Sequence, residues 1–78
     1  MLEQQLIQFV TERTDSHEAI GLHSPLFSEG LLDSMMVLEL TVFVERISGV
    51  QFPPSDITLE NIDSVGRILA FIQSKRSG

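Results

Sequence analysis

The stretch Glu29-Gly30-Leu31-Leu32-Asp33-Ser34-Met35-Met36 marks the end of a loop and the beginning of a strongly apolar helix. Gly30 suits a turn with positive φ, which a residue without a Cβ adopts at little cost. Asp33 and Ser34 are both good N-cap residues, because either side-chain oxygen can accept a hydrogen bond from a free backbone N–H of the first turn. We therefore expect Ser34 at, or one residue inside, a helix N-terminus, with its hydroxyl near the surface.

The Asp33-Ser34 pair has two interpretations. In the first, it does no more than cap the helix, which is the commoner role of such a pair. In the second, Ser34 is a covalent attachment point, because the free N–H groups and the dipole of a helix N-terminus favour a phosphate. The pair alone does not distinguish these interpretations, so the surrounding residues have to.

The helix predicted over residues 34–48 has two different sides. On a period of about 3.6 residues, its core side collects Met36, Val37, Leu40, Phe43, Val44 and Ile47. Its outer side collects Met35, Leu38, Glu39, Thr41, Val42, Glu45 and Arg46. Apolar residues rimmed by charge indicate a docking patch, so Met35, Leu38 and Val42 are candidates for one. The alternative is that another helix or the preceding loop covers them.

The remaining segments predict two more helices and one short turn. Residues 2–13 carry an apolar stripe at helical spacing, and residues 14–33 form a long connection rich in turn formers. Gly49 suits the end of helix 34–48, and Pro53 and Pro54 make residues 51–56 a rigid, non-helical connection.

A short helical turn is expected within residues 57–62, capped by Asp56 or Thr58. The last helix runs from a cap at Asp63 or Ser64 to about Lys75, with a buried stripe of Val65, Ile68, Leu69 and Ile72. The fold class is therefore all-α, a small bundle of three to four helices in one domain spanning residues 1–78, with its core at about 2–75.

The composition of the chain excludes several classes of function. The 78 residues include no Cys, and the formal net charge is −6. Between Thr14 and Gly66 the only base is Arg46, and an acidic surface disfavours nucleic acid and attracts basic proteins. No apolar run is long enough for membrane insertion, and no catalytic or metal-binding motif is present; His17 and His23 lack partners at metal-ligand spacing. We expect a cytoplasmic monomer that is not an enzyme.

The segment from Leu26 to Leu40, LFSEGLLDSMMVLEL, resembles the attachment region of acyl and peptidyl carrier proteins. The resemblance extends over about residues 26–72 through Glu39-Leu40, Glu45, Gly49-Val50, Phe52-Pro53 and Ser64-Val65. The sequence Gly30-Leu31-Leu32-Asp33-Ser34 is also similar to that of free-standing carriers, including D-alanyl and aminoacyl carrier proteins. Two positions depart from the family pattern: Met36 is often polar or acidic there, and Ser48 is often aromatic, with Ile47 available to fill that core space.

The resemblance implies a small bundle of the acyl-carrier-protein type that carries 4′-phosphopantetheine, derived from coenzyme A, on Ser34. Asp33 would be its companion, and Met35 stands in the usual Leu place. The arm's thiol would hold an acyl or aminoacyl group as a thioester for fatty acid, polyketide, nonribosomal peptide or aminoacyl transfer.

The implied partners are a phosphopantetheinyl transferase, an acyl- or aminoacyl-loading ligase (an adenylating enzyme), and downstream acyl or condensing transferases. Met35, Leu38 and Val42 would supply apolar contact, while Asp33, Glu39 and Glu45 would steer basic partner surfaces. Two alternatives remain: an unmodified helical interaction module, and a regulatory domain phosphorylated on Ser34.

Overall fold

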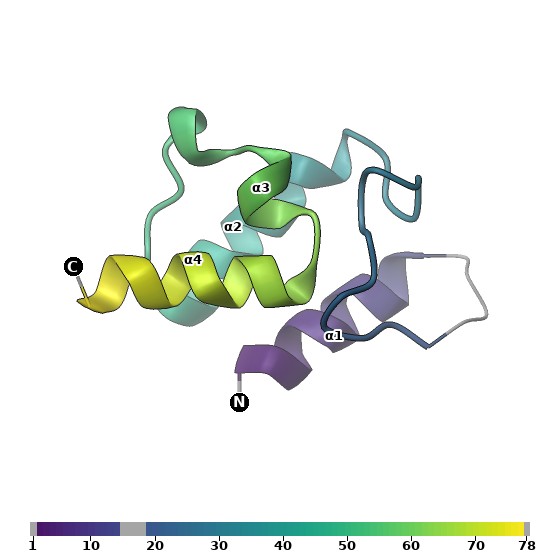
Figure 1. The fold of residues 1–78 in the computed structure, drawn as a ribbon, viewed down its shortest axis with the longest axis horizontal. Coiled ribbons are helices and arrows are strands. Elements are labelled where there is room, and N and C mark those ends of the chain that lie inside the picture. Colours follow the sequence, from purple (N-terminus) through teal and green to yellow (C-terminus); the bar gives the residue numbers. More distant parts are fainter. Residues whose placement is uncertain (1, 15–18, 78) are drawn as a thin grey trace.

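The regular structure of the described residues is entirely helical. The computed structural model describes residues 2–14 and 19–77. In chain order it contains α1 (Leu2–Arg13), α2 (Met36–Ser48), the 3₁₀ turn η1 (Pro54–Asp56), α3 (Leu59–Ile62) and α4 (Val65–Ser77) (Figure 1). This confirms the expected all-α bundle. His17 lies outside the described residues.

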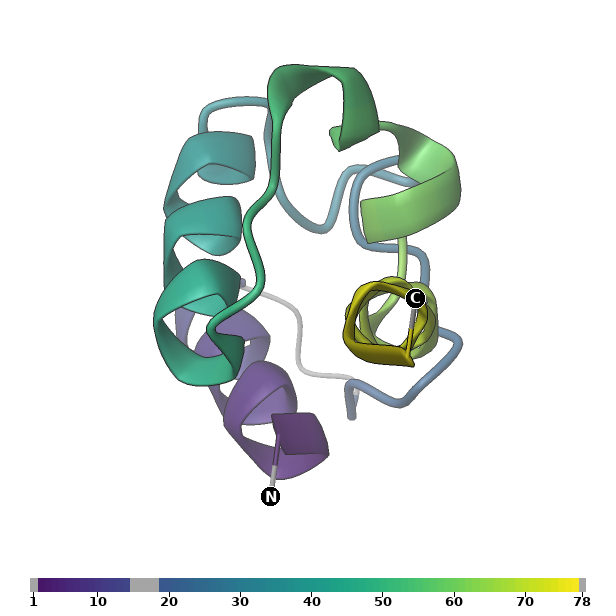
Figure 2. The ribbon, with the colours of Figure 1, turned by 90° about the vertical axis from the view of Figure 1, so that its left-hand side faces the viewer.

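The helices enclose one core. Helix α4 packs against α1 and α3, and α1 also packs against α2. Figure 2 looks along α4 and shows α1 and α2 on the opposite side of the core, with α3 beside α4. None of the described helices is both long and apolar enough to cross a membrane. The arrangement leaves one side of α2 facing solvent.

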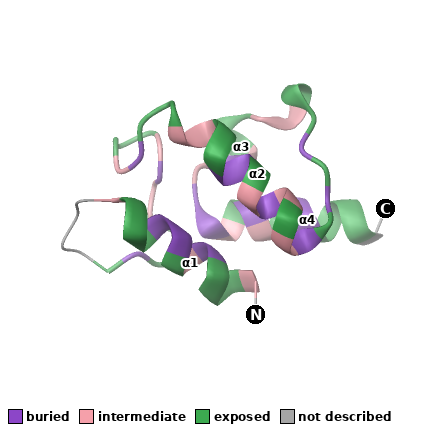
Figure 3. Cartoon of the chain, turned by 180° about the vertical axis from the view of Figure 1, so that it is seen from behind, coloured by how far each residue is buried: buried purple, intermediate pink, exposed green. Residues whose placement is uncertain are grey.

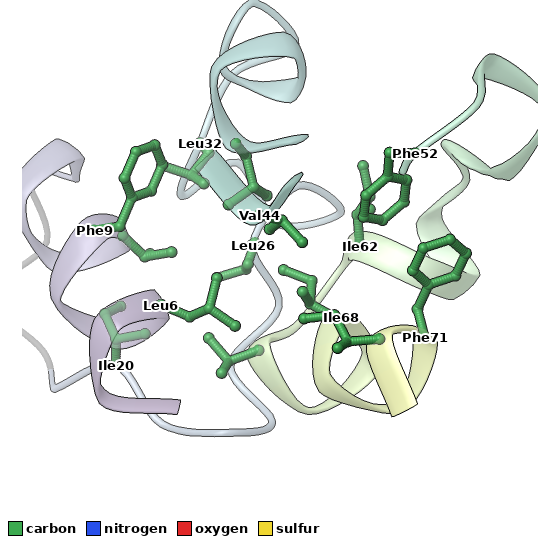
Figure 4. Packing of buried hydrophobic residues seen from close by; sticks show 14 of the residues in the cluster. Leu6, Phe9, Ile20, Leu26, Leu32, Val44, Phe52, Ile62, Ile68 and Phe71 are labelled. Carbon is green, nitrogen blue, oxygen red and sulfur yellow. The ribbon is translucent and has the colours of Figure 1, made fainter. Parts of the chain in front are cut away.

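Apolar side chains from the helices and from the long connection meet in this core. Leu6 of α1, Leu26 of the connection and Ile68 of α4 are fully buried and converge there (Figure 4). Burying a side chain of this size contributes about 1.5–3 kcal/mol. Two ring pairs stack, Phe9 with Phe43 and Phe52 with Phe71, at centroid distances of 4.3 and 4.2 Å. The connection is thus pinned across the bundle, as its apolar residues suggested.

Three details of the prediction for α2 and the segment after it were wrong. The α-helix begins at Met36 rather than at residue 34, and residues 51–56 contain the turn η1. Thr41, placed on the outer side, is buried. Its Oγ1 donates to the Leu38 carbonyl at 3.0 Å, so the hydroxyl is satisfied within the helix and burial costs little.

The departure from the family pattern at the end of α2 is accommodated by hydrogen bonds. Ser48 is buried; its Oγ donates to the Val44 carbonyl at 2.6 Å and accepts from the Val50 N–H at 3.1 Å. Ile47 is half-buried and packs against the core. Gly49 then ends the helix with φ of 74°, as expected, and its N–H donates to the Glu45 carbonyl at 2.9 Å.

Candidate functional site

Ser34 occupies the turn that leads directly into α2. The Asp33 carboxylate accepts a hydrogen bond from the Met35 N–H at 3.0 Å, and the Asp33 carbonyl accepts from the Met36 N–H at 3.0 Å. These bonds close the turn that precedes α2. The N-cap position of the α-helix is Met35, which makes no side-chain cap bond, and Ser34 lies two residues before the first helical residue. The Ser34 side chain is exposed. The predicted exposure of Ser34 is confirmed. The prediction that Asp33 or Ser34 is the N-cap, with Ser34 at or one residue inside the helix, was wrong, because the α-helix begins only at Met36.

The chain reaches this turn through a tight loop. Gly30 has φ of 79°, a left-handed conformation that favours glycine. Its N–H donates to the Phe27 carbonyl at 3.1 Å, and the Leu32 N–H donates to the Leu26 carbonyl at 2.7 Å. Leu26 and Leu32 are both buried. The backbone just before Asp33 is thus fixed by hydrogen bonds and by burial on either side of the glycine.

Asp63 ties this loop to the junction between α3 and α4. Its carboxylate accepts from the Phe27 and Ser28 N–H groups at 2.8 and 2.9 Å and from the Ser28 hydroxyl at 2.8 Å. Asp63 and Ser64 were both candidates for the cap of α4. Ser64 forms it, because its Oγ accepts from the Arg67 N–H at 3.1 Å. Sequence reasoning missed the loop contact, because nothing local links Asp63 to residues 27 and 28.

The electrostatic state of Asp63 reflects these contacts. Burial alone would raise the pKa of its carboxyl. The hydrogen bonds from Ser28 and Phe27, together with the charge of Arg67, outweigh burial and hold the pKa below its ordinary 3.8. The charged form is therefore the one that fits the loop.

The outer side of α2 carries an exposed apolar stripe made of Met35, Leu38 and Val42. Their exposed fractions are 83%, 71% and 52%, so neither a helix nor the described part of the loop covers them. Exposed and buried residues alternate along α2 (Figure 3). Leu59, the first residue of α3, is a further exposed apolar residue at 54%. It was missed because a helix of one turn has too few residues to show a periodicity.

The acidic residues predicted to steer partners are engaged within the chain. Glu39 Oε1 lies 2.6 Å from Arg13 Nε, and Glu45 Oε2 accepts from the Phe52 N–H at 2.6 Å. The Asp33 carboxylate holds the helix start, as described above. Each carboxylate therefore has a structural contact that a docking partner would have to share or replace.

A hollow of about 420 Å³ adjoins Ser34. Its lining is mostly apolar and consists of Phe27, Leu32, Ser34, Val37, Ile57, Thr58, Leu59 and Ile62. Among the described residues, no group of His, Asp or Glu side chains could hold a metal ion. The chemistry available at this end of the bundle is therefore that of an exposed hydroxyl at a helix start beside an apolar surface.

Comparison with known families matches residues 4–72 to the family described as phosphopantetheine attachment site. The chain belongs to this family. It is a carrier and not an enzyme, as expected from the absence of a catalytic motif. A covalently attached 4′-phosphopantetheine is its prosthetic group. The residues present fit such a group, because an exposed serine hydroxyl lies just before α2, at the end of the helix whose dipole would favour a phosphodiester.

The carrier is also similar to several D-alanyl carrier proteins. It is 29% identical over 75 residues to the D-alanyl carrier protein of Abiotrophia defectiva, covering 95% of both chains. It is 36% identical over 55 residues to that of Lactococcus lactis subsp. lactis strain IL1403, covering 70% of both. With the protein of subsp. cremoris strain MG1363 it shares 37% over 54 residues, covering 69% of this chain and 68% of the relative.

Proposed function

We propose that Ser34 is the attachment residue and that the loaded carrier holds D-alanine as a thioester. Three observations support this. Ser34 is exposed in the turn before α2 and directly follows Asp33, whose carboxylate accepts from the Met35 N–H. Residues 26–40 resemble the attachment region of carriers, and relatives that match most of the chain are D-alanyl carrier proteins. The exposed position of Ser34 at the start of α2 is the observation that carries the assignment.

The attachment reaction requires a reachable oxygen nucleophile. The Ser34 hydroxyl would attack the phosphorus of coenzyme A that bears the pantetheine. A P–O bond to Ser34 would form, the bond to the adenosine bisphosphate leaving group would break, and the hydroxyl proton would pass to a base of the transferase. Once attached, the arm supplies a terminal thiol for the cargo, which is why a chain without Cys can carry a thioester.

The protein's own contribution is to present that arm. The pinned loop and the start of α2 would fix the base of the tether, and the tether raises the local concentration of the cargo at a docked enzyme. The apolar stripe and Leu59 flank this position and would give partner enzymes an apolar contact. Successive partners must bind and leave, so a small contact of this kind suits the task.

The partners follow from the chemistry of the cycle. A phosphopantetheinyl transferase attaches the arm, an adenylating ligase activates and loads D-alanine, and a downstream acyl transferase receives it. We place these reactions in the cytoplasm, because coenzyme A and ATP are intracellular substrates. We propose that the carrier acts there as a monomer. An acyl group carried for a condensing transferase is the second candidate, supported by the apolar hollow beside Ser34.

Intact mass spectrometry tests the attachment residue. The wild-type chain, Ser34→Ala and Ser55→Ala are each incubated with coenzyme A and a broad-specificity phosphopantetheinyl transferase. Ser55 is another exposed serine, in the turn η1. We expect a gain of one phosphopantetheine in the wild type and Ser55→Ala and none in Ser34→Ala. A gain in Ser34→Ala, or no gain in the folded, unmodified wild type, would overturn the assignment.

The cargo is tested on the product of that reaction. The arm-bearing wild type is incubated with ATP, a D-alanine-activating ligase and either D-alanine or L-alanine. Separate samples receive a fatty acid and an acyl-activating ligase. A hydroxylamine-sensitive mass gain with D-alanine is expected. Loading only by the fatty acid would overturn D-alanine as the cargo and leave Ser34 as the attachment residue.

A further inference from the structure

Arg13, the last residue of α1, is held in place by contacts with two helices. Its Nε lies 2.6 Å from Glu39 Oε1 on α2. Its Nη1 donates to the Phe9 carbonyl at 3.3 Å, and the guanidinium carbon lies 3.7 Å from the centroid of the Phe9 ring. A guanidinium over an aromatic face is attracted by the ring quadrupole. Arg13 is thus ordered independently of Glu39 and presents a fixed positive charge to it.

The pair lies where a partner can reach it. The side chains of Arg13 and Glu39 are 32% and 51% exposed. Glu39 directly follows Leu38 and lies one helical turn from Met35, so its carboxylate borders the apolar stripe. A partner cation approaching the stripe therefore meets a carboxylate that already has a cation at contact distance.

We propose that Arg13 is a specificity-determining residue that masks Glu39 and makes docking at the apolar stripe depend on apolar contact. A partner that relies on a Lys or Arg opposite Glu39 must displace Arg13 and loses that pair, while a partner with an apolar surface keeps it. This inference rests on the proposed function, because it takes the stripe as the docking surface. Its partner class is an enzyme surface with an apolar centre and no cation facing Glu39.

A charge-matched pair of variants separates local masking from the overall charge. Arg13→Gln and Arg46→Gln each change the formal net charge from −6 to −7, since four bases then face 11 acids. Arg46 is exposed on the outer side of α2, and no ion pair joins it to another described residue. Both variants therefore increase long-range attraction for cations equally, but only Arg13→Gln frees Glu39. It also frees Glu12, whose Oε1 lies 3.7 Å from Arg13 Nη1.

The first test needs no cofactor. A tetra-arginine peptide is titrated into each folded protein at low salt, and its Kd is followed by the backbone amide shifts of residues 35–42. We expect Arg13→Gln to bind about two- to fivefold more tightly than Arg46→Gln, the range set by an exposed ion pair. High salt should remove the difference. Equal affinities for the two variants would overturn the proposal.

Glu39→Gln provides the second arm, and its measurement in the wild-type background does not depend on the folding of Arg13→Gln. In the wild-type background it should change peptide affinity less than about 1.5-fold, because an exposed pair already offsets the charge. In the Arg13→Gln background it should abolish the gain. A several-fold loss in the wild-type background would show that Glu39 is not masked and would overturn the proposal.

The same five proteins then test the link to docking. The kcat/KM for arm attachment by the transferase is compared among these proteins. Attachment of the arm to Ser34 of the wild type reports separately on the proposed function. An enzyme with an apolar docking surface should attach the arm to Arg13→Gln and Arg46→Gln with kcat/KM within about twofold of each other. A larger, salt-sensitive gain confined to Arg13→Gln would show a partner cation facing Glu39 and overturn the assigned partner class. Absent loading of every protein would overturn the function and leave the peptide result standing.

Discussion

Asp63 and Ser28, 35 residues apart in the sequence, are joined by two hydrogen bonds. The Ser28 N–H donates to Oδ1 at 2.9 Å, and the Ser28 hydroxyl donates to Oδ2 at 2.8 Å. The neighbouring Leu26 N–H donates to the Asp63 carbonyl at 2.7 Å. The junction between α3 and α4 thus holds the loop that leads to Ser34, which makes the position of the proposed attachment residue depend on the other end of the chain.

Removing the Asp63 carboxylate should loosen this loop. Asp63→Ala leaves the two loop N–H groups without their acceptor, so we expect a loss of about 1.5–3 kcal/mol in unfolding free energy. Denaturant unfolding measures the loss, and hydrogen exchange should show faster exchange at Phe27 and Ser28. Glu60→Ala, which removes an exposed carboxylate on α3, is the control and should lie within about 0.5 kcal/mol of wild type. Unchanged exchange at both residues would refute the loop contact.

The same carboxylate should make stability sensitive to acid. Because the pKa of Asp63 is lower in the folded chain than its ordinary 3.8, the stabilisation is fully present above the unfolded pKa. It is lost as the pH falls through the folded pKa. The urea midpoint of the wild type should therefore decrease below about pH 4, and less steeply in Asp63→Asn. Identical slopes for the two proteins would contradict this.

Charge within the apolar stripe should affect docking and spare the fold. Val42→Asp and Leu38→Asp change exposed side chains, so unfolding free energy should change by only about 0.5 kcal/mol. Transfer of the cargo to partner enzymes should fall because apolar contact is replaced by a charge that must be desolvated. Leu40→Ala, at a fully buried position, should instead cost about 2–5 kcal/mol. Loss of helicity in Val42→Asp would place Val42 in the core.

Gly49 should be required by the backbone at the end of α2. An added Cβ would meet no atom within 4 Å, but φ of +74° is unfavourable for L side chains. We expect Gly49→Ala to cost about 1 kcal/mol. Gly21→Ala is the matched control: its Cβ would lie 4.0 Å from Ser24 Oγ and its φ is not positive. A thermal melt in which both variants match the wild type would exclude strain at Gly49.

The local features of the carrier were predictable from sequence. The bounds of α1, the exposed position of Ser34 and the exposed stripe on α2 each depend on residues within one or two helical turns. Periodicity and side-chain capping act at that range. The resemblance of residues 26–40 to carrier attachment regions added the family, which the match over residues 4–72 confirms.

Contacts between distant segments were decided only by the tertiary structure. The bond from Asp63 to the loop, the Arg13–Glu39 pair and the bond from the Phe52 N–H to Glu45 each join different elements. Helical spacing puts a carboxylate on a face but does not say which N–H or guanidinium the packed neighbour brings to it. Sequence alone therefore determined where the arm is proposed to attach, while packing decided how that position is held and which charges around it are already paired.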